Sequence, residues 1–167
     1  MEVPKPKTTD SITARVTGEY FKIAQDYIDA GVCVFCELEA TGQFPIATSK
    51  DGRAKLLLNK FPRSQYDMLA ITTDHAVTID QLTEKQLWAL HEMKLLGRSI
   101  LQDVIGRNKL FFLNRDGGDQ TVMHYHDQIQ SYWSGLITWS LEEGRADNLD
   151  QKAHMLIEAA ERLKYGK

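Results

Sequence analysis

The chain has 167 residues, of which 43% are hydrophobic and 26% are charged, and its formal net charge is −3 at pH 7. This length and composition are typical of one globular domain with a substantial core. The charge balance lacks the basic excess of a nucleic-acid-binding domain, and no hydrophobic run approaches the length of a membrane span. Residues 1–10 lack the apolar core of a signal peptide. We therefore expect a cytoplasmic protein that binds neither nucleic acid nor a membrane.

The first third of the chain predicts a tail, a helix and an irregular segment. Residues 1–10 resemble a flexible tail that contains Pro and Lys. Hydrophobic residues recur at helical spacing through residues 17–30 and predict a helix with one buried face, which Gly31 can end. Residues 39–53 are polar and contain several turn signals, so they predict an irregular connection.

The middle of the chain predicts two strands and a long helix. Residues 54–58 and 68–72 are short apolar runs that flank a loop, as strands would. Residues 82–104 predict a helix, because Thr83 can cap it and Gln86, three residues later, completes a capping box. The apolar side chains expected to face the core are Leu87, Leu90, Met93, Leu96, Ile100 and Val104.

The last third of the chain predicts two more strands and a second long helix. Residues 110–113 form a short apolar run, and a glycine-bearing turn leads from it to residues 120–128, which we interpret as a strand. Residues 148–165 predict the last helix. This mixture of elements predicts the α+β class, with a largely antiparallel sheet covered by helices.

The most informative segment is the run from residue 120 to residue 128. On a strand, side chains alternate between the two faces, so His124, His126 and Gln128 would share one face at spacings of about 6.6 Å. Two imidazoles and an amide in a row, beside two glycines, are unusual on a strand selected only for packing. The pattern suggests chemistry on a phosphate, with a histidine as the attacking group.

The two cysteines form a C-x-x-C pair, Cys33 and Cys36. In a reducing compartment such a pair is typical of a metal site or a redox pair rather than of a structural disulfide. The spacing alone does not decide between these two uses.

Three separate segments together resemble the histidine triad (HIT) superfamily. Residues 58–75 resemble its first conserved block, with Asn59 near the start, then a strand, then His75. Residues 114–128 resemble its second block, which has an Asn, a glycine-rich turn and Gln-Thr-Val-x-His-x-His. The Cys33-Val34-Phe35-Cys36 segment resembles the opening of the zinc-bearing members. Order and spacing agree across all three segments, which makes the resemblance more specific than one motif.

The resemblance covers residues 32–130 and implies an architecture for the whole chain. It implies a two-layer fold, in which a mostly antiparallel sheet of about five strands carries a long helix, with further helices near both ends. Residues 32–130 would form a nucleotide-binding catalytic core. Residues 1–31 would be an N-terminal tail and helix, and residues 131–167 a C-terminal helical extension of the same compact domain.

Two positions depart from the usual pattern of the superfamily. Gln128 stands where the third histidine is expected, and His-x-His-x-Gln resembles the branch of galactose-1-phosphate uridylyltransferase and the diadenosine polyphosphate phosphorylases. Those enzymes are longer or are built of two such units. Asp119 stands where a glycine usually precedes the Gln, and a carboxylate there would repel a phosphate unless it is paired or points away.

By resemblance, the second histidine of the motif, His126, is the nucleophile. A neutral imidazole can attack an α-phosphorus and form a nucleotidyl-histidine. Its other ring nitrogen must then hold a proton against an acceptor, for which a nearby backbone carbonyl would serve. Gln128 can donate an amide N–H to a phosphoryl oxygen, but it cannot protonate a leaving group. This favours leaving groups that need no proton, such as a phosphate.

The resemblance also implies residues that contact the nucleotide, the phosphate or the leaving group. The glycine turn can supply backbone N–H groups to an anion, whereas an ordinary turn would use the same glycines and asparagines. The expected binding residues are Asn59, Asn114, Gly118, Gln120 and Thr121.

A structural zinc ion is the expected cofactor. Cys33, Cys36, His75 and His124 would provide two thiolates and two neutral imidazoles, which suit a closed tetrahedral zinc site. In zinc-bearing relatives the first histidine of the motif is a ligand. A competing interpretation places both His124 and His126 on one ion that activates water, but it leaves the cysteines unexplained.

Together these features imply an enzyme that acts at the α-phosphorus of a nucleoside phosphate, such as a dinucleoside polyphosphate or a nucleotidyl conjugate. It would be a hydrolase or a nucleotidyltransferase. Two other functions stay open at this point: a non-catalytic zinc-containing nucleotide-binding module, and a thiol–disulfide oxidoreductase that uses the C-x-x-C pair. A homodimer is expected from the resemblance and from the surplus of apolar helix faces.

Overall fold

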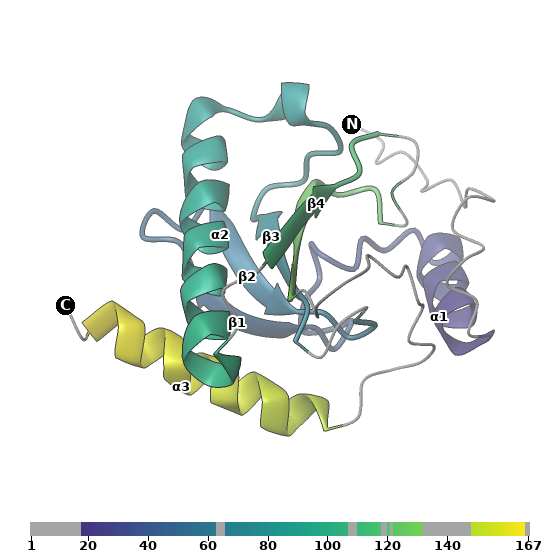
Figure 1. Cartoon of the computed structure of the whole chain (residues 1–167). Coiled ribbons are helices and arrows are strands. Elements are labelled where there is room, and N and C mark those ends of the chain that lie inside the picture. The colour runs from purple at the N-terminus through teal and green to yellow at the C-terminus, as the bar shows by residue number, and fades with distance from the viewer. Residues whose placement is uncertain are drawn as a thin grey trace.

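One antiparallel sheet forms the centre of the fold (Figure 1). The computed structural model describes residues 18–62, 66–106, 110–117, 120, 122–131 and 148–165. Within these residues the sheet has five strands, in the spatial order β1-β2-β3-β5-β4, and all neighbours are antiparallel. The strands are β1 (Phe44–Thr48), β2 (Ala54–Leu58), β3 (Met68–Thr72), β4 (Leu110–Asn114) and β5 (His126–Ser131).

The chain also forms helices before, within and after the strands. They are α1 (Gly18–Asp29), the short 3-10 helix η2 (Ile79–Gln81), α2 (Glu84–Ile105) and α3 (Leu149–Tyr165). The long helix α2 packs across one face of the sheet, α3 packs against α2 and β1, and α1 lies away from α2 (Figure 1). The α+β architecture expected from the sequence is therefore confirmed. None of the described helices is both long and apolar enough to cross a lipid bilayer.

The two faces of the sheet bury different side chains. The face toward α2 contributes Leu56, Leu58, Met68, Ala70 and Ile129 to the main core. Gly97 lets α2 approach this face closely, because a Cβ atom there would lie 2.8 Å from Ile129 Cδ1. On the opposite face Phe35, from the segment after α1, packs against Leu57, Leu69 and Ile71. The site described below lies on this second face.

The ends of α2 form as the capping signals predict. Gln86 N donates to Thr83 Oγ1 (3.3 Å), and Thr83 N donates to Gln86 Oε1 (2.9 Å). Gly106 ends the helix with a φ of 63°, a left-handed conformation that glycine adopts at little cost. The predicted inward stripe is right for Leu90, Met93 and Ile100, which are buried, but Leu87 is exposed.

The prediction that residues 39–53 are irregular is wrong, because Phe44–Thr48 forms β1. Pro45 weakens the strand signal of this segment. Proline is tolerated on an edge strand, where its missing N–H need not face a neighbour, and β1 is at the edge of the described sheet. The pairing register with β2 shifts between Pro45 and Ala47, as it does at a β-bulge.

The prediction that residues 120–128 form one strand is correct only for its last part. β5 begins at His126, and the backbone over residues 122–124 is bent. His124 N donates to the carbonyl oxygen of Val122 (2.8 Å), a tight turn that ends the simple alternation of faces. His126 and Gln128 thus share a strand face, whereas His124 lies where the chain turns into β5.

Candidate metal centre and active site

Four metal-binding side chains come together from three distant parts of the chain. Cys33 and Cys36 lie on the turn after α1, where Cys36 N donates to Cys33 O (3.1 Å). His75 follows β3, and His124 precedes β5. Their ligand atoms all lie within 4.8 Å of one another, and His126 is not a member of this group. The structure therefore assembles the four residues that the sequence suggested for zinc.

The distances in this group fit a tetrahedral zinc ion. Cys36 Sγ lies 3.3 Å from His75 Nδ1 and 3.5 Å from His124 Nδ1, and Cys33 Sγ lies 3.4 Å from His124 Nδ1. With bonds of about 2.3 Å to sulfur and about 2.0–2.1 Å to nitrogen, tetrahedral zinc holds such atoms about 3.6 Å apart. The residues present are thus compatible with a structural Cys₂His₂ zinc site.

The environment of His124 keeps its ring neutral and directs one nitrogen to the cysteines. Burial lowers the pKa of His124 to about 4. Its Nε2 donates to the carbonyl oxygen of Thr72 (2.9 Å), so the lone pair belongs to Nδ1 on the cysteine side. Burial also lowers the pKa of His75. Both imidazoles are therefore in the form that binds a metal.

The pKa of the Cys36 thiol is shifted in the direction opposite to that of an activated redox thiol. Partial burial of the sulfur, followed by the nearby Cys33 and Glu37, raises the pKa of Cys36 to about 12. Thiol–disulfide enzymes lower the pKa of the attacking cysteine, because the thiolate is the nucleophile. A coordinated metal ion deprotonates such a thiol outright. The raised pKa of Cys36 therefore counts against a redox role for this cysteine, and the case for a metal rests on the arrangement of the four side chains.

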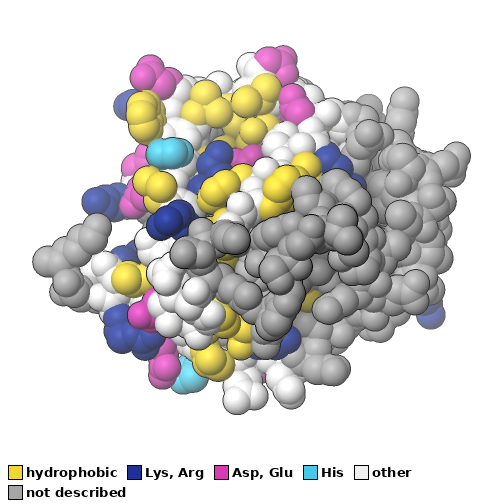
Figure 2. Space-filling model, in the orientation of Figure 1, with side chains coloured by type: hydrophobic (Ala, Val, Ile, Leu, Met, Phe, Trp, Pro, Cys, Tyr) yellow, Lys and Arg dark blue, Asp and Glu magenta, His cyan; other side chains and the backbone are white. Residues whose placement is uncertain are grey.

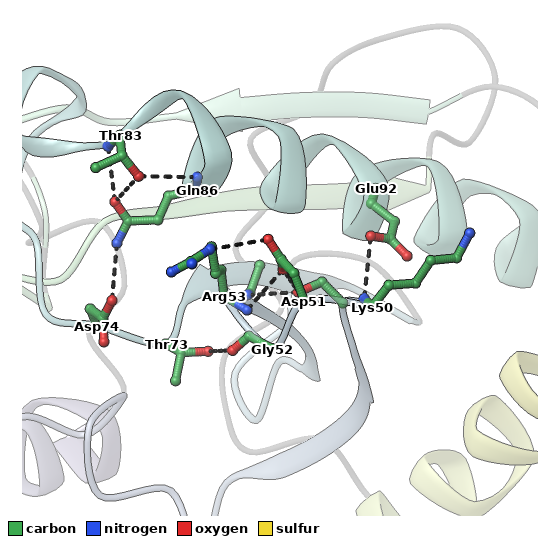
Figure 3. A network of polar contacts seen from close by, with 11 residues as sticks. Lys50, Asp51, Gly52, Arg53, Thr73, Asp74, Thr83, Gln86 and Glu92 are labelled. Carbon is green, nitrogen blue, oxygen red and sulfur yellow. Dashed lines mark hydrogen bonds and ion pairs between the residues drawn. The ribbon is translucent and has the colours of Figure 1, made fainter.

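The loop that carries His75 is anchored to the start of α2 (Figure 3). Gln86, buried in the capping box of α2, donates from Nε2 to Asp74 Oδ2 (3.4 Å). Thr73 Oγ1 donates to the carbonyl oxygen of Gly52 (2.7 Å), at the turn before β2. These contacts hold the residues just before His75 from two sides, so the position of this ligand depends on the core of the domain.

One ring nitrogen of His126 is held by a backbone acceptor, as attack by the other ring nitrogen requires. Its Nδ1 lies 2.8 Å from the carbonyl oxygen of His124 and donates to it. A neutral ring with its proton on Nδ1 has its lone pair on Nε2. The side chain is 6% exposed, and the ring of Phe35 stands edge-on to it at 5.4 Å between centroids. The metal-site segment thus orients His126 through the backbone of His124.

Gln128 follows His126 on the same face of β5. Its Oε1 accepts a hydrogen bond from Gln130 Nε2 (2.9 Å). This bond turns the amide oxygen toward Gln130 and the amide NH₂ to the other side. Gln130, which is not among the residues predicted from the sequence, therefore orients the amide N–H donors of Gln128.

Of the other residues predicted to bind the nucleotide, Asn59 and Gln120 form hydrogen bonds with loop backbone. Asn59 Oδ1 accepts from Phe61 N (3.0 Å), as in an ordinary turn. Gln120 is buried, and its Nε2 donates to the carbonyl oxygen of Val77 (2.9 Å). Gly118 and Thr121, like Asp119, lie outside the described residues. The structure thus gives Asn59 and Gln120 roles in shaping loops, and their contacts with a nucleotide stay predictions.

Asn114 is the last residue of β4 and pairs with Asp127 of β5, and its side chain lies on the face of the sheet toward α2. Its Nδ2 donates to the carbonyl oxygen of His126 (2.9 Å) and to Asp127 Oδ1 (3.1 Å). Asp127 also forms an ion pair with Lys94 of α2, in which the charged atoms lie 2.8 Å apart. Neither Asp127 nor Lys94 belongs to the site predicted from the sequence, although an acidic residue between His126 and Gln128 in a core strand is itself an unusual signal.

Comparison with known proteins gives structural matches only. No protein-family model matches the chain, and no curated protein matches it by sequence. A zinc-bound histidine triad family protein from Mycobacterium smegmatis superposes with a TM-score of 0.67 at 17% identity, over 81% of this chain and 97% of that chain. A hypothetical histidine triad nucleotide-binding protein from Sulfolobus tokodaii gives 0.67 at 20% identity, over 79% and 94%. The fold is the HIT fold.

A third HIT-fold match is an enzyme. The diadenosine triphosphate hydrolase of Plasmodium falciparum, solved with cyclomarin A, superposes with a TM-score of 0.58 at 15% identity, over 72% of this chain and 76% of that chain. Identities this low establish the shared HIT fold and leave the activity to be argued from the site. The two-layer HIT architecture expected from the sequence is confirmed, and the transferase branch suggested by Gln128 stays a prediction.

Proposed function

We propose that this protein is a nucleotide hydrolase or nucleotidyltransferase that acts through a covalent nucleotidyl-histidine at His126. The substrate class is a nucleoside phosphate with a leaving group on the α-phosphorus, such as a dinucleoside polyphosphate or a nucleotidyl conjugate. Support comes from the HIT fold, which this chain has in common with a diadenosine triphosphate hydrolase, and from the arrangement of His126 and its neighbours.

The observation that carries the proposal is the 2.8 Å contact between His126 Nδ1 and the carbonyl oxygen of His124. It supports a ring with its lone pair on Nε2, the atom that would attack. In that step the Nε2–P bond forms while the bond to the leaving group breaks, and the leaving group takes the electron pair. Water or a phosphate then attacks the phosphorus, and the P–N bond breaks with its electron pair returning to Nε2, which restores the neutral ring. When water is the acceptor, its proton passes to solvent.

Gln128 is proposed to stabilise charge on the phosphoryl oxygens during both steps. An amide N–H is a suitable donor to such an oxygen in a site that excludes water. It supplies no proton to a departing group, so phosphate or pyrophosphate leaving groups are favoured over alkoxides. Asn59, Gln120 and the glycine turn are proposed to shape the nucleotide-binding loops around this centre.

The zinc ion is proposed to be structural. Four protein ligands leave no open position for water, which distinguishes a structural site from a catalytic one. A reducing cytoplasmic setting, which is part of the proposal, would keep both thiols available to the metal. Zinc would fix the Cys33–Cys36 turn against His124, whose carbonyl oxygen orients His126.

The direct test is to trap the intermediate. The protein is mixed with a dinucleoside polyphosphate labelled at the α-phosphorus and quenched in denaturant without acid, because a P–N bond is labile to acid. We expect label on the protein that is lost on treatment with acid. Nucleotide binding without label and without turnover would contradict the proposal and would instead support a non-catalytic nucleotide-binding module. His91, an exposed histidine on α2, provides the control variant His91→Ala, which should be labelled like the parent.

A homodimer is proposed as the assembly. Among the described strands, β4 pairs with β5 and stands at one edge of the sheet. Phe112 on β4 and Trp88 and Leu95 on α2 are large hydrophobic side chains that are 46%, 65% and 52% exposed. Figure 2 shows hydrophobic side chains gathered over the part of the surface where α2 and β4 lie. An edge strand beside an exposed apolar patch is typical of an interface between chains.

The dimer is tested by sedimentation of the parent and a charged variant. We expect the parent to sediment at about twice the 19.0 kDa mass of the chain. Trp88→Glu combined with Phe112→Glu should give a monomer, because buried unpaired carboxylates oppose association. Met155→Glu, at an exposed hydrophobic position of α3, should remain a dimer. A parent that sediments as a single chain would rule the dimer out.

A further inference from the structure

A buried ion pair lies directly behind the proposed nucleophile. Asp127 is the residue between His126 and Gln128 in β5, and it pairs across the sheet with Ala70, which faces α2. Its carboxylate therefore lies on the face opposite His126. Lys94 of α2 reaches it at 2.8 Å; the Asp127 side chain is 8% exposed, and the Lys94 side chain is partly buried, at 29% exposed. A carboxylate buried as deeply as that of Asp127 persists in a fold only when it is paired.

Asn114 connects this ion pair to the backbone of His126. The two hydrogens of its Nδ2 serve two acceptors, the carbonyl oxygen of His126 (2.9 Å) and Asp127 Oδ1 (3.1 Å). The contacts therefore run in one line, from Lys94 to Asp127, from Asp127 to Asn114, and from Asn114 to the peptide group that follows His126. This line joins α2, β4 and β5 at one point.

Net stability does not account for the ion pair at this position. Neighbouring positions on the α2 face of β3 and β5 carry the hydrophobic residues Ala70 and Ile129. A buried ion pair contributes little stability compared with such packing. An apolar side chain at position 127 could not accept a hydrogen bond from the Asn114 amide. The Asp127 carboxylate does accept one, and this directs the other amide hydrogen to the carbonyl oxygen of His126.

We infer that Lys94, Asp127 and Asn114 are positioning residues that fix the backbone of His126 for attack on phosphorus, an inference that rests on the proposed function. His126 is then held from both sides. Its Nδ1 is fixed by the carbonyl oxygen of His124, and its own carbonyl oxygen is fixed by Asn114. A nucleophile must be placed to within about 0.5 Å, and a displacement of about 1 Å can lower a rate about 100-fold.

The test separates positioning from stability with three variants and a control. Lys94→Met leaves Asp127 buried without its cation, so we expect a lower melting temperature, by about 5 °C. Lys94→Met combined with Asp127→Leu removes both charges and should recover the melting temperature of the parent. Asn114→Leu removes the clamp alone. Asp103→Asn removes an exposed ion pair between α2 and α3, with Arg162, and should leave the kinetics unchanged.

Two readouts are compared in each variant at one fixed pH. The first is turnover of a dinucleoside polyphosphate, for which we expect kcat to fall about 10- to 100-fold in the double variant and in Asn114→Leu, with little change in KM. The second is the ¹⁵N spectrum of the His126 ring in protein labelled at histidine, which reports the proton on Nδ1 without any substrate. We expect the single parent tautomer signal to be replaced by a broadened or mixed signal.

The two readouts keep the failure of this inference distinct from the failure of the proposed function. If the double variant recovers kcat and the parent His126 signal along with the melting temperature, the ion pair is only structural and the inference is overturned. If the parent turns over no nucleotide, the proposed function fails, and the His126 signal still decides whether the network orients the ring. If Lys94→Met does not fold, the double variant and Asn114→Leu carry both readouts.

Discussion

Replacing His126 with alanine should lower turnover of a dinucleoside polyphosphate by at least about 1,000-fold and abolish the acid-labile label. The variant retains the fold and the binding loops but has no atom to form the P–N bond, and loss of a covalent nucleophile is among the largest single effects in enzymes. Steady-state kinetics and label incorporation measure the two expectations on the same preparation. The zinc content should stay at that of the parent, because His126 is not part of the ligand group.

That zinc measurement also decides between the two metal interpretations. If His126→Ala lost its metal while His75→Ala kept it, zinc would sit between His124 and His126 and the proposed nucleophile would be a ligand. Residual turnover in His126→Ala equal to the parent would mean that another group attacks the phosphorus. His91→Ala, which removes an exposed histidine of α2, should match the parent in rate, label and zinc.

Removing zinc should destabilise the whole domain. Elemental analysis of protein purified without chelator should give about one zinc per chain, and Cys33→Ser or a strong chelator should remove it. A metal present at about 1,000 times its Kd stabilises the folded state by about 4 kcal/mol. For a chain of this size that corresponds to a fall in Tm of roughly 8–16 °C. Thermal unfolding with and without chelator measures it.

The control for the zinc prediction is a histidine outside the group. His154 lies on α3, where it forms an exposed pair with Glu158, and His154→Ala should keep both the metal and the Tm. Adding zinc back to the chelated parent should restore its Tm, but should not restore that of Cys33→Ser. A parent that carries no zinc and unfolds at the same temperature with and without chelator would contradict the prediction.

The sequence predicted which four side chains come together, because each of them stands at a recognisable signal. Cys33 and Cys36 form a spaced pair, His75 follows a predicted strand, and His124 opens the motif. The structure brings their ligand atoms together although the residues are far apart in sequence. Elements with strong local signals, such as the capped helix α2 and the apolar strands β2 and β3, were likewise predicted close to their bounds.

The features that the sequence did not reveal depend on tertiary contacts. β1 was missed because Pro45 reads as a turn residue until its place at the sheet edge is known. The bend at His124 was missed because a strand pattern says nothing of the Tyr125–Ala76 hydrogen bond that redirects the chain. Lys94 and Asp127 are 33 residues apart and belong to different periodic patterns, so no local rule connects them.

The wide separation in sequence of the four candidate zinc ligands has a practical consequence for anyone who prepares this protein. Cys33 and His124 are 91 residues apart in sequence and their side chains meet only when the turn after α1, β3 and β5 are all in place. A chain that coordinates zinc with all four ligands has therefore closed its longest loop. A measured zinc content of one ion per chain would therefore indicate, before any assay, that the chains in a sample are correctly folded.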